Sequence, residues 1–479
     1  MLFRVYQTRA FQGQPMSKSQ LTVITILLLL GVSAQSSDPK LAYLAYGDLR
    51  GYLEPCGCDP KSDLGGAKRM MAVLERERSL NPNLALFDLG NNVKFDGPLA
   101  RLKAPFILEA TSQYQPDAVL WNKLEEEKAD AVAKILTDKK MSLPYVRTYP
   151  PSPHKWVKPM QSTSTGQVFG YVADGDRKTG VTWLREKVAK APKAKRRFLL
   201  FAGGEADLRE IAELGLFDVI VSASAKPMDY APGGYERDDI SQLVRLVDEK
   251  LGAIRSVSVG GQGLLRGGSL TTSEAKPLAE LFGNNPVGSP AKNSLPLPSA
   301  TKELFYTWLG PDQGGDELLP DLFKRYQAAT EKQFQAQAAE RLSQLKDSLY
   351  VGAETCQGCH ADSYAVWKES SHAQAIATLQ QVGKDRDPEC VTCHVVGGDK
   401  PGGFVDMKHS PHLANVQCET CHGPRKEHVQ NPTVHPKLAV GPKEVCVSCH
   451  HPPHSTAFDF ESYWEKIKHG KEAIRVSPD

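Results

Sequence analysis

A five-residue pattern of two cysteines, separated by two residues and followed at once by a histidine, occurs four times in the last third of the chain. In this pattern both thiols can add to the vinyl groups of one porphyrin, and the histidine then lies against the iron as an axial ligand. Zinc sites and redox dithiols also use paired cysteines, but neither needs a histidine after every second cysteine. The sequence therefore predicts four covalently bound c-type haems. The predicted attachment residues are Cys356, Cys359, Cys390, Cys393, Cys418, Cys421, Cys446 and Cys449, and the predicted proximal ligands are His360, His394, His422 and His450.

The segment that contains these motifs is small for four cofactors. Residues 351–469 are too few, and too rich in Gly, Pro and His, to build a large aliphatic core, so the porphyrins must supply the apolar interior. We expect an α-rich, loop-rich module that does not fold without haem. Residues 351–479 carry 13 Lys and Arg against 16 Asp and Glu, a net charge of −3, which favours a basic redox partner protein. The whole chain has a net charge of +2 without a basic stripe, so no nucleic-acid partner is expected.

The order of elements from about residue 350 to 470 resembles the tetrahaem cytochrome c family that accepts electrons from hydroxylamine oxidoreductase. The resemblance rests on stretches such as "CVTCHVVGGDKPGGF", "VQCETCHGPRKEH" and "FESYWEKIKHG". It implies distal axial ligands for three haems: His428 for the first, His372 for the third and His469 for the fourth.

The second haem is the one for which the resemblance implies no strong distal ligand. Here His409 and His412 precede the third motif, and a neutral imidazole is a strong axial ligand. We expect His412 to bind this iron, with His409 and an open iron as alternatives. Four capped irons favour a pure electron carrier, whereas an open iron favours an oxidoreductase acting on a small nitrogen or sulfur species. The remaining histidines of the module, His435, His451 and His454, are expected to be surface residues.

In the N-terminal part, short apolar runs alternate with helical stretches, which is typical of an α/β domain. Examples of the predicted strands are 41–46, 84–90, 197–204, 217–224 and 254–261. The predicted boundaries are a signal peptide at 1–34, the α/β domain at 41–283, a Pro/Ser-rich linker at 284–300, a helical connector at 301–350 and the haem module at 351–479.

The order of these strands resembles the metallophosphoesterase domain of secreted 5′-nucleotidases, which implies layered sheets and helices. "YLAYGDLRGYLEPCGC" matches the opening strand and its D-x-H turn, but Arg50 replaces the histidine while Asp48 remains. The family's D-x-G-D ends here in Asn91, and its Asn-His pair is Asn122-Lys123. A two-metal hydrolase needs carboxylate and imidazole ligands to hold its ions. The departures predict a non-catalytic relative, with an active phosphoesterase carrying haems as the alternative.

Cys56 and Cys58 lie apart from the haem motifs and are too close together for an unstrained disulfide. They are either structural thiols, or a redox pair or soft-metal site near the position of the active site in the resembling hydrolases.

The N-terminus has the features of a secretory signal. Lys18 precedes an apolar run, Leu21 to Val32, which is short for a membrane span, and small residues follow as far as Ala34. We therefore expect a periplasmic or otherwise exported protein, with membrane association only if the signal stays uncleaved.

Overall fold

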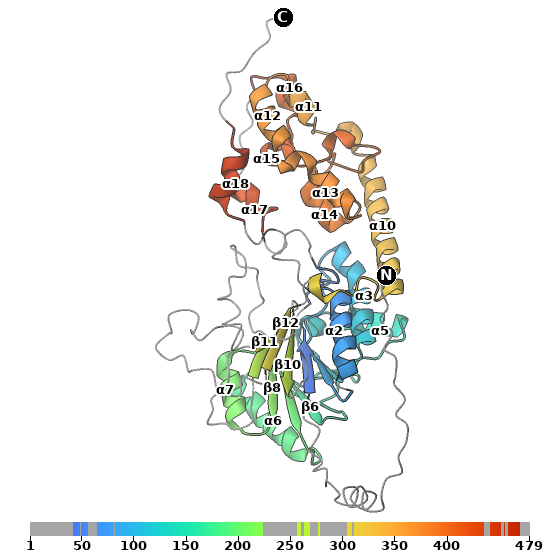
Figure 1. Ribbon diagram of the computed structural model, residues 1–479, viewed down its shortest axis with the longest axis vertical. Helices are drawn as coiled ribbons and strands as arrows, with labels where there is room; N and C mark the ends of the chain where they lie inside the picture. The colour runs from blue at the N-terminus through green and yellow to red at the C-terminus, as the bar shows by residue number, and fades with distance from the viewer. Residues whose placement is uncertain are drawn as a thin grey trace, which may run out of the picture. The chain divides into compact units, whose positions relative to one another are not determined.

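The computed structural model describes residues 42–47, 49–55, 65–80, 82–223, 256–259, 263–268, 276–277, 304–308, 311–434, 441–451, 455 and 458–469. Within these ranges an α/β part is followed by a helical part (Figure 1). This confirms the predicted fold class. The predicted signal peptide and the predicted linker at 284–300 lie outside the described residues.

The first sheet has the strand order β11-β12-β10-β1-β2-β3-β4 among the described residues. Its parallel half runs from β1 to β4, and its other half is antiparallel through β10. The strands are β1 (Ala42–Tyr46), β2 (Ala85–Asp88), β3 (Ala118–Leu120), β4 (Tyr145–Val146), β10 (Gly263–Gly268), β11 (Lys276–Pro277) and β12 (Leu304–Trp308).

The second sheet has the order β5-β6-β7-β8-β9, with β6 to β9 parallel. It comprises β5 (Met160–Ser162), β6 (Gln167–Val172), β7 (Arg197–Ala202), β8 (Val219–Ala223) and β9 (Ser256–Val259). Buried runs in β6 and β7 fit parallel strands that are covered on both faces. The two sheets meet where Phe87 of β2 and Phe198 of β7 pack with ring centroids 5.0 Å apart.

Helices flank both sheets because each presents one apolar face to the strands. Those of the α/β part are α2 (Ala67–Leu80), α3 (Pro98–Tyr114), α4 (Lys123–Glu127), α5 (Ala129–Asp138), α6 (Arg177–Lys190) and α7 (Glu205–Glu213). Residues of α2, α3 and α5 share one core cluster with β1 and β2.

Helix α10 (Pro320–Leu342) joins the two parts and contributes to the cores of both. Leu322, Phe323 and Tyr326 belong to the core of the α/β part, whereas Phe334 packs in the core of the helical part. Residues 301–350 were predicted to be helical, but 304–308 form β12, which pairs with β10 in the first sheet. That strand depends on a partner far away in the sequence, which local periodicity does not reveal.

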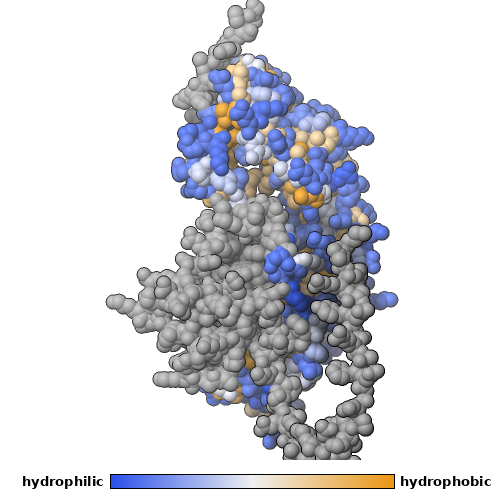
Figure 2. Space-filling view, in the orientation of Figure 1, coloured by the Kyte–Doolittle hydropathy of each residue, from blue (hydrophilic) through white to orange (hydrophobic). Residues whose placement is uncertain are grey.

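The helical part consists of short helices joined by loops. They are α11 (Ala353–Cys356), α12 (Ala361–Glu369), α13 (Ala375–Gln381), α14 (Pro388–His394), α15 (Cys418–His422), α16 (Lys426–Gln430), α17 (Pro442–Val447) and α18 (Phe460–Ile467). Polar residues dominate its visible face, with small apolar patches between them (Figure 2). No helix among the described residues is long and apolar enough to span a bilayer.

Candidate functional site

The four cysteine motifs each start on a short helix, which sets the two thiols and the histidine close together. Helix α14 holds Cys390, Cys393 and His394, and α15 holds Cys418, Cys421 and His422. Asp387 caps α14, because its carboxylate accepts a hydrogen bond from the backbone N–H of Glu389 at 3.1 Å.

Three pairs of histidines face each other in the helical part. The pairs and their ring-centroid separations are His360–His428 at 6.2 Å, His372–His450 at 6.0 Å and His422–His469 at 5.8 Å. A histidine nitrogen binds a first-row metal ion at about 2.0 Å, so two rings on opposite sides of one iron have centroids roughly 6 Å apart. Each pair thus joins one motif histidine and one histidine from elsewhere at a spacing that fits a single iron ion.

The pairing differs in part from the one that the resemblance implied. His428 faces the first motif, as expected. His372 was expected at the third haem and His469 at the fourth, but His372 faces His450 of the fourth motif and His469 faces His422 of the third. The His372 carbonyl accepts a hydrogen bond from the N–H of Val416, close before the third motif, while its ring points to the fourth. The backbone of His372 therefore contacts the segment before the third motif, whereas its ring faces the fourth motif. The order of the motifs in the sequence does not reveal this difference.

Hydrogen bonds at Nδ1 orient several of these rings. The Nδ1 atom of His394 lies 2.6 Å from the carbonyl oxygen of Ala375, and that of His428 lies 2.7 Å from the carbonyl oxygen of Val434. His469 makes the same kind of contact, at 3.1 Å to a nearby carbonyl. A carbonyl only accepts, so Nδ1 carries the proton and Nε2 keeps its lone pair for a metal ion.

Three of the paired histidines, His372, His422 and His450, have lowered pKa values, which suits metal binding. Burial, together with neighbouring histidines, lowers the pKa of His450 to about 4. Burial is likewise the main reason why the pKa values of His372 and His422 are lowered. At neutral pH these rings are therefore neutral, which is the form that binds iron.

Motifs that are far apart in the sequence lie close together in space. The Cys356 thiol of the first motif lies against the Cys418 thiol of the third, and this contact and burial raise the pKa of Cys356. Burial raises the pKa of Cys421 in the third motif to about 11, with the thiols of the fourth motif adding to the effect. His394 of the second motif also contributes to the lowered pKa of His450 in the fourth. The third motif is therefore a neighbour of both the first and the fourth.

The second motif differs from the other three in its distal candidates. His412 is exposed, and its ring lies beside Gly352, which precedes α11. His409 is held by Asp406, with 2.8 Å between Nδ1 and a carboxylate oxygen. These contacts place neither ring against His394, so the assignment of His412 stays a prediction. Of the other histidines, His451 is exposed, as expected, and His435 and His454 lie outside the described residues.

In the α/β part, a hydrogen-bonded polar network lies where the resemblance implied a metal centre. The Nδ2 atom of Asn92 donates to both carboxylate oxygens of Asp88 at 2.8 Å. The backbone N–H groups of Asn91 and Asn92 donate to the Glu125 carboxylate at 2.9 and 2.8 Å. Burial raises the pKa of Asp88 to about 6 and that of Glu125 to about 7. Among the described residues, no group of three or more His, Cys, Asp or Glu could hold a metal ion.

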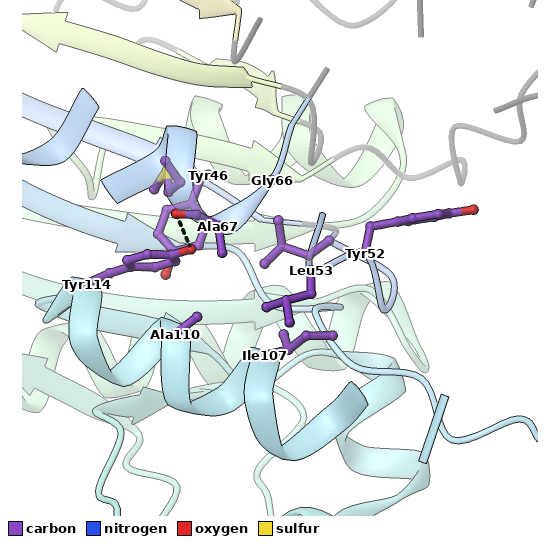
Figure 3. Close-up of a pocket in the computed structure, with 10 residues that line it drawn as sticks. Tyr46, Tyr52, Leu53, Gly66, Ala67, Ile107, Ala110 and Tyr114 are labelled. Atoms are coloured by element: carbon purple, nitrogen blue, oxygen red, sulfur yellow. Dashed lines mark hydrogen bonds between the residues drawn. The ribbon is translucent and has the colours of Figure 1, made fainter. Parts of the chain in front are cut away.

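A small hollow lies between α2, α3 and the end of β1 (Figure 3). Leu53, Ile107 and Ala110 line it, and the Tyr114 hydroxyl closes one end by donating a hydrogen bond to the carbonyl of Ala67 at 3.1 Å. Its lining is mostly apolar, so it suits side-chain packing better than metal ions. Three residues singled out in the sequence, Asp48, Cys56 and Cys58, lie outside the described residues.

Sequence reasoning missed two features of this site. The buried carboxylate Glu125 was not singled out, although it follows the Asn122-Lys123 pair closely. The cap of α14 was also missed, although Asp387 before Pro388 is a typical helix-start pattern that could have been read from the sequence.

Comparison with known proteins gives matches for both parts of the chain. Residues 355–423 match the family model described as "Cytochrome c554 and c-prime". Cytochrome c-554 of Nitrosomonas europaea is 33% identical over 93 residues, which are 16% of this chain and 40% of that protein. The chain therefore spans less than half the length of this curated relative. The family-model match at residues 355–423 covers the first three motifs, and a cytochrome family of this type implies covalently bound c-type haem.

Solved structures that resemble this chain include nucleotidases. The NAD nucleotidase of Haemophilus influenzae aligns with a TM-score of 0.37 and 13% identity, over 49% of each chain. The 5′-nucleotidase precursor of Thermus thermophilus aligns with a TM-score of 0.39 and 14% identity, over 60% of this chain and 58% of that one. Likenesses at this level do not bear on activity.

Proposed function

We propose that the chain is an exported tetrahaem c-type cytochrome that transfers electrons between redox partner proteins in the periplasm. The observation that carries the proposal is the spacing of the three histidine pairs, each of which fits one iron ion between a motif histidine and a distal histidine. The match to a cytochrome family over residues 355–423 supports it. The number of four haems goes beyond that match, because the fourth motif lies outside it.

When bound, each haem supplies a one-electron redox centre. The chain's own residues would hold the four haems: the cysteines through covalent bonds to the porphyrin, and the motif and distal histidines through bonds to the iron. Where two neutral imidazoles bind one iron, no position would be left for a substrate. Neighbouring haems would then let electrons pass through the module to a partner protein.

Intact mass and haem staining test the proposed number of haems. Protein matured in an export host that attaches haem should keep its stain after denaturation and should weigh four haems more than the processed polypeptide. The variant Cys446→Ala/Cys449→Ala should lose one haem and keep three. A count of two or fewer in the parent protein would overturn the proposal.

A haem-dependent oxidoreductase is the second candidate. It requires that neither His412, which lies beside Gly352, nor His409, which is paired with Asp406, binds the second iron. We retain His412 as the proposed distal ligand of the second haem. Electron paramagnetic resonance of the oxidised protein distinguishes the two. A high-spin signal from about one iron per chain, with carbon monoxide binding after reduction, would support an open second haem and a small nitrogen or sulfur substrate. If that signal appears only in His412→Ala, the carrier proposal stands.

We also propose that the α/β part is a non-catalytic accessory domain. Asn91 and Lys123 stand where the resembling hydrolases have metal ligands. The backbone N–H of Asn91 is bonded to Glu125, and its side-chain oxygen lies 3.3 Å from the backbone N–H of Leu124. Asn91 is thus hydrogen-bonded to the Glu125 side chain and to the backbone of Leu124, which supports a structural role for this end of the sheet.

A further inference from the structure

The segment that leads into the second motif carries charged side chains that contact the α/β part. Glu389, at the start of α14, forms an ion pair with Lys103 of α3. Lys384 forms a second ion pair, at 2.5 Å, with Glu54. Lys384 also lies 3.6 Å from Asp387, the cap of α14. The segment that leads into and includes the second motif is therefore linked to the α/β part by two ion pairs.

The two side chains of the Lys103–Glu389 pair differ in their exposure to solvent. The Lys103 side chain is 6% exposed, whereas the Glu389 side chain is 45% exposed. Lysine is seldom buried so completely unless its charge is paired. The position of Lys103 on α3 is fixed by packing, because α3 contacts α10 through Phe106 and Tyr326, with ring centroids 5.5 Å apart.

Helix α10 holds the same segment from a second side. Phe334 of α10 packs in one cluster with Val391 of α14. Glu331 of α10 forms an ion pair with Arg386 at 2.9 Å. The second motif thus takes its position from α3 and α10 as well as from its own module.

We propose that the α/β part supports the second haem, with Lys103 as a positioning residue that sets the reduction potential of the haem attached at Cys390 and Cys393. This inference rests on the proposed function, since it requires a haem at the second motif. Reduction adds a negative charge to the haem, so a nearby ammonium group favours it and a nearby carboxylate opposes it. Glu389 is next to Cys390 in the chain, and Lys103 offsets its charge.

The test measures the reduction potentials of all four haems in the full-length, haem-loaded protein. Lys103→Met keeps most of the aliphatic stem but leaves Glu389 unpaired, so it should lower the potential of one haem. The expected change is about threefold to tenfold in the reduction equilibrium, ~30–60 mV at 59 mV per tenfold. Glu389→Gln should raise the potential of the same haem. The double variant should bring it back close to the parent value.

A matched control separates a local effect from a general change in charge. Lys134→Met also removes one positive charge from the α/β part, but Lys134 is 75% exposed. It should leave all four potentials unchanged. The haem that shifts in Lys103→Met should be the one that is missing from Cys390→Ala/Cys393→Ala.

The outcomes distinguish this inference from the proposed function. If the parent protein binds two haems or fewer, the proposed function fails first. If four haems load but Lys103→Met shifts none of them, shifts all of them equally, or matches Lys134→Met, the inference is wrong. If Lys103→Met does not load haem, Glu389→Gln alone tests the inference, because the Glu389 side chain is half-exposed. An unchanged or lowered potential of the second haem in Glu389→Gln would overturn the inference.

Discussion

Single histidines decide how each iron would be held, and His372 is the most informative of them. Its ring faces His450 of the fourth motif at a centroid separation of 6.0 Å. His372→Ala should therefore open one coordination position on the haem attached at Cys446 and Cys449. Electron paramagnetic resonance of the oxidised variant should show about one new high-spin iron per chain.

Two further variants check that assignment. His154→Ala removes a histidine of the α/β part and should leave the spectrum unchanged. Adding His372→Ala to Cys446→Ala/Cys449→Ala should give no new high-spin signal, because the affected haem is absent. A new signal in that combination would mean that His372 binds the iron of another haem.

The buried carboxylates of the α/β part predict how its stability depends on pH. Burial raises the pKa of Asp88 to about 6 and that of Glu125 to about 7, so the folded state binds more protons than the unfolded state between about pH 4 and 7. This contribution to stability is present at low pH and is lost as the pH rises through that window. One pKa unit corresponds to about 1.4 kcal/mol, so the loss from Glu125 is on the order of 3 kcal/mol.

Glu125→Gln should remove the contribution of Glu125 to this dependence. Its amide would also face the N–H groups of Asn91 and Asn92, which costs about 1–3 kcal/mol. Urea unfolding, followed by circular dichroism at pH 5 and pH 8, should show the parent protein losing more stability than the variant as the pH rises. Glu127→Gln, at an exposed position of α4, is the control. Equal losses in the parent and in Glu125→Gln would contradict the prediction.

Helix α10 is the element that joins the two cores, and its second half belongs to the helical part. Phe334 is 4% exposed and packs in the cluster that includes Val391 and Phe404. Phe334→Ala should destabilise the helical part by about 3–5 kcal/mol, because it removes buried apolar surface and leaves a cavity.

Thermal unfolding of the haem-loaded variant, monitored by haem absorbance, tests this prediction. Lys332→Ala, at an exposed position of the same helix, should unfold close to the parent protein. Similar midpoints for Phe334→Ala and Lys332→Ala would show that α10 does not contribute to the core of the haem module.

At the scale of the whole molecule, the two parts divide their roles: one carries the predicted haems, and the other carries a polar network without a metal cluster among its described residues. Arg50, Asn91 and Lys123 stand where the resembling hydrolases have metal ligands, so we expect no turnover of nucleotides or generic phosphate esters when Mg²⁺, Mn²⁺ or Zn²⁺ is added. Colourimetric phosphate release over a range of pH values measures this. Steady turnover that is lost in Asp48→Ala would show that the α/β part is an active hydrolase.

The sequence by itself determined the chemistry of the attachment sites and the two-part organisation. The spacing of two cysteines and a histidine is a local requirement of one porphyrin, so four repeats are enough to predict it. Short apolar runs such as those that form β2 and β7 were equally clear, because strands buried in a parallel sheet need little beyond their own hydrophobicity.

Only the tertiary structure decided which groups meet across the chain. His372 and His469 have the motif partners opposite to those expected, because axial pairing depends on how loops fold over neighbouring motifs. The ion pair between Lys103 and Glu389 joins residues 286 positions apart, and no local pattern predicts such a contact. Haem attachment depends on short-range geometry, whereas pairing and domain contacts depend on long-range packing, and this physical difference sets what could be predicted.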